Sequence, residues 1–225
     1  MKNTIVAKKA VIMVIDGCRP DVLKQANTPN IDSLWKNGSY SWRAKTVYPS
    51  ISLPPICSLF WGVSPEIHGI KSNRIPEDYS YKVPTIFDLC KGKGLKTAMV
   101  HGWWPFNTTV RHGTVDILDM NSSYLTDDLK AANSCVRIIE QEHPDFSFHH
   151  FNKIDKTGEE HGWMSKEQIM AVEDCDKAIG LVLNALKIRA CSFEKTIITV
   201  TADHGGHDKT HGTDDPQDMI IPWIC

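Results

Sequence analysis

The chain has 225 residues, of which 41% are hydrophobic and 23% charged, which is ordinary for a globular protein with a sizeable core. Its 25 basic and 27 acidic side chains give a formal net charge of −2, so charge provides no basis for binding a nucleic acid polymer or an anionic membrane surface. No apolar run approaches the length of a transmembrane helix, and residues 1–4 lead almost directly into the first expected strand without the apolar segment of a signal peptide.

The cysteines are odd in number, scattered and set mostly in apolar surroundings, and no CxxC pair indicates a structural zinc site. This pattern predicts reduced thiols in a cytoplasmic protein, where disulfides are rare. The seven positions are Cys18, Cys57, Cys90, Cys135, Cys175, Cys191 and Cys225.

The first expected element is a strand over residues 11–16, with the letters VIMVID. Its unbroken apolar run is typical of a buried parallel strand. The run ends in Asp16, which Gly17 follows, and an Asp-Gly pair is also a common turn signal. One strand of this kind is therefore ordinary when taken alone.

A helix is expected next, with Thr28 as its N-cap and Pro29 at its first helical position. It should end at Asn37 and Gly38, and residues 39–47 should be extended. The side chains expected in its buried stripe are Ile31, Leu34 and Trp35.

A second apolar helix is expected over residues 56–61, and the two prolines before it, Pro54 and Pro55, are tolerated only in a first helical turn. Ser52 therefore lies at or just before the start of this helix. Unpaired N–H groups and the helix dipole favour an anion there, such as an alkoxide or a phosphoryl oxygen. A plain N-cap is the alternative role for Ser52, and by itself the helix start does not distinguish the two.

The middle of the chain carries fewer chemical signals. Trp103 and Trp104, at the end of an expected strand, could form the wall of a substrate pocket or a buried structural pair. The expected elements are a loop over residues 62–80, a short helix over 84–90, a strand over 97–101, an irregular region over 110–124 and a helix over 125–141. One face of the last helix should carry Leu129, Ala132, Val136 and Ile139.

Residues 146–154 predict another strand, and Asp155 follows it, with Glu159 and His161 close behind. A strand followed by acidic and imidazole side chains repeats the pattern at Asp16 in a richer form. His149 and His150, within this strand, are expected to be structural residues on the strand faces and not ligands.

Ser165 and Gln168 then match a capping box at the start of a long amphipathic helix. Its buried positions should be Ile169, Val172, Ile179, Val182 and Leu186.

The most informative stretch is residues 196–212, TIITVTADHGGHDKTHG. Its strand ends in Asp203 and His204, after which Gly205 and Gly206 permit a tight turn. Two carboxylates and three imidazoles within residues 203–211 suit a borderline divalent cation such as zinc. The alternative is a polar surface loop rich in histidine, which the similar strand at residues 11–16 disfavours.

Ligands bind beyond the carboxyl ends of strands in open α/β sheets, so side chains that follow three strands should converge there. The convergent candidates are Asp16; Asp155 with Glu159 or His161; and Asp203, His204 and His211. Two metals about 4 Å apart, together with the hydroxyl of Ser52, suit phosphoryl transfer, because one lowers the pKa of the nucleophile and the pair holds the attacking and leaving oxygens.

The chain resembles the alkaline phosphatase superfamily in its nucleotide pyrophosphatase/phosphodiesterase-like, or type I phosphodiesterase, branch. The matching segments follow one another over nearly the whole chain. They are VIMVIDGCRPD at 11–21, TPNIDSL at 28–34, YPSISLPP at 48–55, GVSPEIHGI at 62–70, DKTGEEHGW at 155–163, ADHGG at 202–206 and HGTDDP at 211–216. The resemblance implies an α/β fold, a three-layer α/β/α sandwich around a central, mostly parallel sheet, as one catalytic domain over residues 1–225.

The resemblance also implies two divalent metal ions and a small-molecule phosphate ester as substrate. The net charge gives no reason to expect a nucleic acid polymer or a membrane as partner. Zinc is expected, with manganese and magnesium as alternatives. One metal would lie with Asp16, Ser52, Asp203 and His204, and the other with Asp155 and His211. Ser52 would be the nucleophile, forming a covalent phospho-enzyme that a metal-activated water hydrolyses.

Three departures from the family pattern stand out. The pattern DxxGHxxG has histidine where this chain has Glu159, and His161 follows two residues later. Pro55 stands where the phosphodiesterases have an asparagine that holds a phosphoryl oxygen. The chain also stops at residues 221–225, where relatives continue into further sheet and helix, which indicates a shortened or minimal form of the domain.

Glu159 and His161 are alternative ligands. Glu159 lies four residues after Asp155, so one helical turn would bring both to the same face, whereas His161 requires the loop to fold back past Gly158. Histidine is the better zinc ligand, and glutamate would favour a harder cation. Spacing favours Glu159, with His161 beside the metal or at the substrate entrance.

The sequence therefore predicts a metal-dependent phosphodiesterase or phosphatase. The alternatives are a phosphomutase or a sulfate- or phosphonate-ester hydrolase on the same core, and a degenerate protein that binds without catalysis. Glu159, Pro55 and the short C-terminus motivate the last alternative, and the full set of other ligands argues against it.

Overall fold

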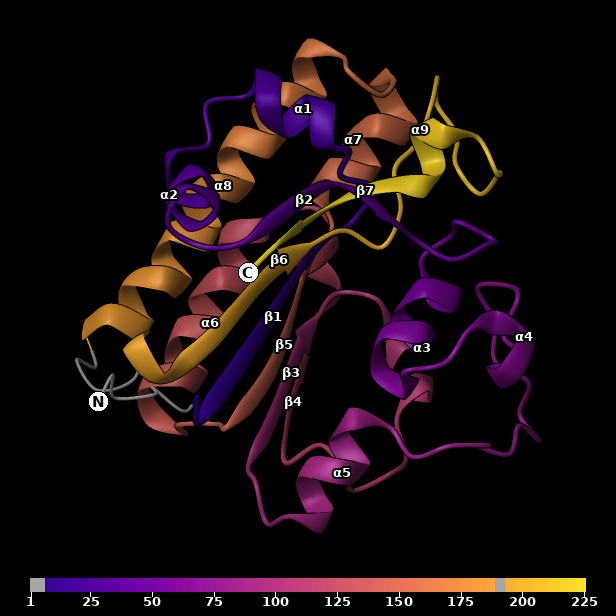
Figure 1. Ribbon diagram of the computed structural model, residues 1–225, viewed down its shortest axis with the longest axis vertical. Coiled ribbons are helices and arrows are strands. Elements are labelled where there is room, and N and C mark those ends of the chain that lie inside the picture. Colours follow the sequence, from indigo (N-terminus) through magenta and orange to yellow (C-terminus); the bar gives the residue numbers. More distant parts are fainter. Residues whose placement is uncertain (1–6, 189–192) are drawn as a thin grey trace, which may run out of the picture.

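Seven strands form one sheet in the order β2-β7-β6-β1-β5-β3-β4 in the computed structural model, which describes residues 7–188 and 193–225 (Figure 1). The pairs around β1, β3, β5 and β6 are parallel, and only β7 and β2 run antiparallel to their neighbours. The strands are β1 (Lys9–Ile15), β2 (Tyr40–Lys45), β3 (Thr97–His101), β4 (Ile117–Met120), β5 (Phe146–Phe151), β6 (Thr196–Thr201) and β7 (Ile220–Ile224).

Helices cover both faces of this sheet, which confirms the expected three-layer α/β/α arrangement. Helices α6 and α8 lie on one side, and α3 and α5 lie on the other (Figure 1). The helices are α1 (Pro20–Gln25), α2 (Pro29–Asn37), α3 (Leu53–Trp61), α4 (Pro65–His68), α5 (Ile86–Gly92), α6 (Asp128–Gln141), α7 (Lys153–His161), α8 (Lys166–Ile188) and α9 (Pro216–Met219). Short 3₁₀ helices span Trp104–Thr109, Ser122–Leu125 and Phe193–Lys195.

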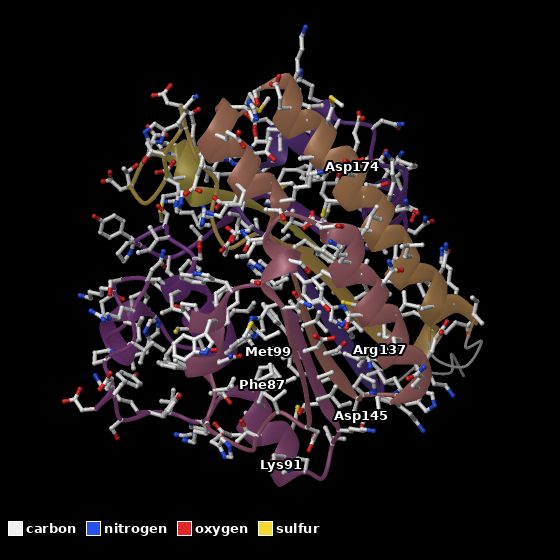
Figure 2. All side chains as sticks on the ribbon, turned by 180° about the vertical axis from the view of Figure 1, so that it is seen from behind. Phe87, Lys91, Met99, Arg137, Asp145 and Asp174 are labelled. Atoms are coloured by element: carbon white, nitrogen blue, oxygen red, sulfur yellow. The ribbon has the colours of Figure 1, made fainter. Side chains whose placement is uncertain are left out.

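Each face of the sheet has its own apolar core. Met13, Ile15 and Phe151 pack with the buried sides of α1, α2, α6, α7 and α8. Val14 and Phe148 pack with α3 and α5. Figure 2 shows the molecule from behind, with α6 and α8 crossing the sheet and with Phe87 of α5 near Met99 of β3. Because side chains alternate along a strand, neighbouring residues of β5 enter opposite cores.

Most of the expected helices and strands are present in the structure. The differences lie in short elements whose formation depends on tertiary contacts. The region 62–80, expected as a loop, contains α4, and the region 110–124 contains β4 and the 3₁₀ helix Ser122–Leu125. Helix α6 begins at Asp128 and not at residue 125, and Leu129, expected on its buried face, is 44% exposed. Ala131, Cys135 and Ile138 are buried on that face instead.

Two predicted helix caps are completed by other groups. Thr28 makes no side-chain capping bond to α2. The buried carboxylate of Asp176 in α8 accepts hydrogen bonds from the backbone N–H groups of Asn30 at 3.2 Å and Ile31 at 2.8 Å. Ser165 does accept from the Gln168 N–H at 3.2 Å, but the Gln168 side chain accepts from the Met164 N–H, so the capping box is half formed.

The six cysteines that the structure describes are free thiols, and five of them are buried. The prediction of a seventh free thiol concerns Cys191, and the prediction about a signal peptide concerns residues 1–4. Both lie outside the described residues. Among residues 7–188 and 193–225, no helix has both the length and the apolar character needed to cross a membrane.

Candidate active and metal site

The candidate site lies where the carboxyl ends of β1, β5 and β6 meet. Asp16 directly follows β1, and its N–H donates to Phe151 O at the end of β5 at 2.9 Å. Asp203 follows β6, and its carboxylate accepts from the Gly17 N–H at 3.3 Å. The parallel sheet thus brings together two acidic residues that are 187 positions apart in the chain.

Asp155 reaches the same place by a different route from the predicted one. It does not end a strand, because β5 stops at Phe151 and Asp155 lies in the first turn of α7. Gly17 makes room for it: a Cβ atom on Gly17 would lie 3.1 Å from both Cα and Oδ1 of Asp155. Gly17 also has φ of +68°, which glycine adopts without the strain a side chain brings.

Ser52 is the residue before α3, as Pro54 and Pro55 predicted, and it is 8% exposed. Its Oγ lies 3.4 Å from Nε2 of His204. The next N–H in the helix, that of Leu53, donates to the side-chain oxygen of Asn73 at 2.9 Å. The hydroxyl therefore faces the cluster at the strand ends, beside a helix start that an asparagine side chain caps.

The Nε2 atom of His204 lies at the centre of the site. It is 3.2 Å from a carboxylate oxygen of Asp16 and 3.7 Å from one of Asp203. The other ring nitrogen, Nδ1, lies 2.8 Å from the carbonyl oxygen of Gly205, to which it donates when protonated. This backbone contact orients the ring so that Nε2 is directed at the carboxylates.

His211 is oriented in the same way on the loop between β6 and β7. Its Nδ1 lies 3.2 Å from the carbonyl oxygen of Ser50, and its ring stacks on that of His204 with centroids 3.9 Å apart. Its Nε2 lies 3.8 Å from both Asp155 Oδ1 and Glu159 Oε1. His211, Asp155 and Glu159 thus face one another, although their elements are remote in sequence.

Glu159 and His161, the two alternative ligands, lie in different surroundings in the structure. Asp155 and Glu159 lie on one face of α7, as the four-residue spacing predicts. His161, at the end of that helix, is 41% exposed and lies 3.6 Å from Glu160. Glu159 also contacts a cation of the chain, since Lys156 Nζ lies 2.6 Å from its second oxygen. Glu159 therefore faces the site, and its ligand role stays a prediction.

The buried carboxylates and the imidazoles among them shift one another's pKa values. Burial, followed by the charges of Asp203 and Asp155, raises the pKa of Asp16 well above its usual value. Burial likewise raises the pKa of Asp155. Burial alone would lower the pKa of His204, but Asp203 and Asp16 outweigh it and raise that pKa well above the usual range. A cation among these groups would stabilise their ionised forms.

The donor atoms fit divalent metals. Asp16 Oδ1, Asp155 Oδ1 and Asp203 Oδ2 are buried and make no hydrogen bond within the described part of the chain. Two groups of side chains each offer three donor atoms within 4.8 Å of one another: Asp155 with His204 and His211, and Asp16 with His150 and Asp203. Carboxylate oxygens mixed with imidazole nitrogens suit zinc and manganese.

The loop after β6 needs glycines because neighbouring groups pack closely against its backbone, and not mainly because the chain turns there. A Cβ on Gly206 would lie 2.1 Å from the ring of Trp163, and one on Gly205 would lie 2.0 Å from the backbone oxygen of Gln217. The Trp163 indole donates to Gly17 O at 2.9 Å, and Arg19 donates to Gly206 O at 2.9 Å. These contacts hold the loops after β1 and β6 against each other.

Not every predicted imidazole enters the site. His207, from the stretch of three histidines, pairs with the buried carboxylate of Asp218 at 2.7 Å and belongs to the loop scaffold. Two residues near the site were not expected there from the sequence. Asn73 follows the segment GVSPEIHGI by three residues, and His150, expected to be structural, has its Nε2 3.5 Å from Asp16 Oδ2.

A cavity of about 570 Å³ is linked to the candidate site through Asn73, which caps α3 beside Ser52 and is one of the residues that line the cavity. Trp104 lines it and is 61% exposed, whereas Trp103 packs edge-on against Phe106, so the two tryptophans have different roles. The lining comprises Asn73, Arg74, Ile75, Pro76, Glu77, Tyr79, Tyr81, Trp104, Pro105 and Thr108.

Comparisons with known proteins agree on the fold and on one family. The model of the family described as type I phosphodiesterase / nucleotide pyrophosphatase matches residues 10–219. The venom phosphodiesterase of Macrovipera lebetinus is 27% identical over 220 residues, which cover 87% of this chain and 25% of that protein. The ectonucleotide pyrophosphatase/phosphodiesterase family member 1 of Homo sapiens is 26% identical over 198 residues, which cover 79% of this chain and 21% of that protein. The chain thus spans about a quarter of the length of these relatives.

Solved structures match the fold at low identity. The murine ectonucleotide pyrophosphatase/phosphodiesterase 5, solved in complex with AMP, superposes with a TM-score of 0.75 at 21% identity, over 88% of this chain and 57% of that chain. A 2-O GAG sulfatase superposes with a TM-score of 0.78 at 15% identity, over 97% of this chain and 64% of that chain. At these identities the likeness establishes the arrangement of the sheet and helices and leaves the reaction to the side chains.

Proposed function

Because the chain belongs to the type I phosphodiesterase / nucleotide pyrophosphatase family, we propose that it is a metal-dependent hydrolase of phosphate esters that uses Ser52 as its nucleophile. One observation carries the proposal. Three buried carboxylates, each with an oxygen that makes no hydrogen bond within the described residues, lie around the Nε2 of His204, which is 3.4 Å from the Ser52 hydroxyl. Such a charge arrangement calls for cations and is suited to phosphoryl transfer.

Two metal positions follow from the donor groups. Asp16 and Asp203 would hold one ion beside Ser52, and Asp155, His211 and Glu159 would hold the other, with His204 between them. When bound, the two cations would polarise the phosphoryl oxygens and lower the pKa of the attacking hydroxyl. Zinc fits the imidazole donors, and the carboxylate-rich set, Glu159 included, also suits manganese or magnesium.

The chain's own groups would position the phosphoryl centre. Ser52 precedes α3, and the positive end of the helix dipole favours an anionic oxygen there. The helix start has no N–H to donate to that oxygen, because the N–H of Leu53 donates to Asn73 and Pro54 and Pro55 have none. Asn73 brings an amide to the same helix start, and an amide supplies a donor that Pro55 lacks. Its side-chain NH₂ would hold a phosphoryl oxygen in place of the asparagine expected at position 55.

The cavity beside Asn73 would receive the organic part of the ester. Its walls include the rings of Tyr79, Tyr81 and Trp104, which favour a flat, partly apolar group. Its volume of about 570 Å³ lies in the range of pockets for small organic ligands. The AMP bound by the murine relative is consistent with a nucleotide ester, or more broadly with a phosphate ester that carries a flat organic group.

A substrate panel tests this function. Zinc-, manganese- and magnesium-loaded protein is assayed with p-nitrophenyl phosphodiesters, a p-nitrophenyl monoester and a sulfate ester. We expect turnover of phosphate esters, with metal content verified by elemental analysis. Turnover of the sulfate ester alone would favour the sulfatase branch. Full metal content without turnover of any ester would favour a binding protein without catalytic activity. Glu159 and Pro55, which depart from the family pattern, are the reason to consider this alternative.

Replacement of the proposed nucleophile gives the decisive variant. Ser52→Ala should lower turnover by roughly 10³-fold or more, because no other hydroxyl would replace the attacking group. The fold and most of the metal content should persist, since the carboxylates and imidazoles remain. Turnover is measured together with metal content and the far-UV circular dichroism spectrum. Near wild-type turnover by verified Ser52→Ala protein would exclude Ser52 as the nucleophile.

A further inference from the structure

His150 and His149 form a pair of neighbouring, fully buried histidines in β5, and neither has a hydrogen-bonding partner for its ring nitrogens within the described residues. A buried polar group without a hydrogen bond is costly, so each needs a physical reason. The two rings enter opposite cores because side chains alternate along the strand. His150 pairs in register with Val14 and lies on the face of α3, whereas His149 pairs with Met13 on the other face.

His150 lies beside the carboxylates of Asp16 and Asp203 in the candidate metal site. Its Nε2 is 3.5 Å from Asp16 Oδ2, too far for a good hydrogen bond. One donor atom each of His150, Asp16 and Asp203 lies within 4.8 Å of the other two. All three side chains are buried, and Asp203 Oδ2 has no hydrogen bond among the described residues either.

The ring is held in this position by aromatic packing. Phe106 stands edge-on to it with centroids 4.7 Å apart, and Phe148 lies nearly parallel at 6.2 Å. Two rings thus fix the imidazole plane, and Nε2 is held near the carboxylates without any hydrogen bond to them. A side chain so constrained is preorganised to bind a cation placed between the carboxylates.

From this geometry we propose that His150 is a ligand of the metal held by Asp16 and Asp203. This proposal rests on the metal sites of the proposed function and adds a donor to them. The site at Asp16 and Asp203 would then combine two carboxylates with an imidazole, and His204 Nε2 would be free to lie with Asp155 and His211, the group in which its donor atom clusters. The imidazole donor would favour zinc or cobalt over magnesium at this position.

His149 provides a matched control, because it is the adjacent histidine in the same strand and equally buried. His150→Phe and His149→Phe each replace a buried imidazole by an apolar ring, and only the first removes a nitrogen from the site. The metal-free forms of both variants and of the wild type are titrated with Zn²⁺ against a chromophoric chelator, and with Co²⁺ by visible absorption.

We expect His150→Phe to lose affinity at one of the two metal positions by about 100-fold or more, since even an outer hydrogen-bonding partner of a ligand contributes about 10–100-fold. The visible bands of Co²⁺ at that position should change in energy and intensity, because the donor set changes. His149→Phe should retain both affinities and the wild-type Co²⁺ spectrum.

A second measurement uses the wild-type chain, so it does not depend on how His150→Phe folds. The ring ¹⁵N resonances of the histidines are followed by NMR during Zn²⁺ addition, and the His149 signal is assigned from its absence in His149→Phe. We expect a His150 ring nitrogen to shift on metal binding, as the ring nitrogens of His204 and His211 do, while the His149 signal stays in place.

The outcomes separate this proposal from the proposed function. An unchanged His150 ring nitrogen in zinc-loaded wild type overturns the proposal, as does a His150→Phe variant with wild-type affinity and Co²⁺ spectrum. Reduced affinity with an unchanged spectrum and unchanged ring nitrogen also overturns it, because His150 would then only support Asp16. Absence of metal binding by the wild type would contradict the proposed function itself.

Discussion

Asp16, Asp155 and Asp203 set the chemistry of the candidate site at the scale of single residues. Each is at most 4% exposed, and each has a carboxylate oxygen without a hydrogen bond among the described residues. Removing a carboxylate from water costs several kcal/mol unless an opposite charge compensates. Protonation of His204 and the binding of cations both compensate this charge, and a metal ion supplies more charge at this point than one imidazole.

The first prediction concerns Glu159, whose carboxylate lies between His211 and Lys156. Glu159→Gln should weaken metal binding at Asp155 and His211 much more than His161→Ala does, because His161 is directed toward Glu160. Glu159→His should shift metal preference toward zinc, since imidazole is the softer donor. Competition titrations with zinc, manganese and magnesium on the three variants measure both effects.

His161→Ala is the control for Glu159→Gln, because both substitutions are on α7 and both side chains are about 40% exposed. A larger loss of affinity in His161→Ala than in Glu159→Gln would assign the ligand to His161. It would also require the C-terminal end of α7 to rearrange when metal binds.

The second prediction concerns Asp128, a buried carboxylate that is not among the proposed metal ligands. It accepts from the N–H groups of Asn152 at 3.0 Å and Lys153 at 3.3 Å, at the start of α7. Burial nevertheless raises the pKa of Asp128 from 3.8 to about 6. The folded state therefore binds more protons than the unfolded state between these values, so stability is present below pH 4 and is lost as the pH rises through about 6.

Asp128→Asn keeps an acceptor oxygen and removes this titration. The free energy of unfolding of the variant, relative to wild type, should therefore increase between pH 4 and pH 7, by about 3 kcal/mol from linkage. Urea unfolding of both proteins at several pH values, without added metal, measures the difference. A difference that is constant over this range would contradict a raised pKa for Asp128.

At the scale of elements, the helices that carry the site depend on capping groups from remote segments. The carboxylate of Asp128 in α6 accepts a hydrogen bond from the backbone at the start of α7. The carboxylate of Asp176 in α8 does the same at the start of α2. Local sequence would have assigned the second role to Thr28. A buried acceptor from a packed neighbour replaces the local cap, because it satisfies two N–H groups and anchors α2 to the core at once.

The third prediction follows from that anchor. Asp176→Ala should lower the free energy of unfolding by about 1–3 kcal/mol, because buried N–H groups of α2 lose their acceptor. The loss should leave metal affinity unchanged, since α2 does not contribute a ligand. Chemical denaturation and metal titration measure the two quantities.

Glu173→Ala is the matched control on the same helix. Glu173 lies one turn before Asp176 and accepts from the N–H of Asn27 at 3.0 Å in an exposed hydrogen bond. Exposed bonds contribute less, because water replaces the lost partner. Equal destabilisation by the two substitutions would show that Asp176 contributes no more than an exposed contact.

At the scale of the whole molecule, the proposed metals would connect segments from the full length of the chain. The ligands come from the end of β1, the start of α3, helix α7, and the loop between β6 and β7. A cation bound only by the folded chain adds stability by mass action, about 2.7 kcal/mol when free metal is at 100 times Kd. For a chain of this size, 1 kcal/mol shifts Tm by about 2–4 °C.

The fourth prediction is therefore a thermal one. A strong chelator should lower the Tm of protein shown to contain metal, and addition of zinc or manganese should restore it. Ser52→Ala, which keeps the carboxylates and imidazoles, should show the same response. Identical melting curves with and without chelator would argue against metals bridging these segments.

The sequence alone determined the layer architecture and most candidate ligands. The buried strands at residues 11–16 and within the stretch 196–212 were evident from apolar and β-branched composition, and Pro54 and Pro55 located the start of α3 beside Ser52. These features depend on local properties, namely the missing N–H of proline and the apolar composition of buried parallel strands, so they can be predicted without knowledge of tertiary contacts. The motif order then indicated the family over nearly the whole chain.

Tertiary structure decided which side chains meet. Asp155 approaches the site from a helix and not from a strand end, His207 pairs with Asp218, and Asn73 reaches the start of α3 from a loop. It also decided that His150 and not His149 adjoins Asp16, which depends on the pairing of β5 with β1. A shift of one residue in that pairing would exchange the two imidazoles, because the side chains of a strand alternate between faces and only the packed sheet determines which face holds the site.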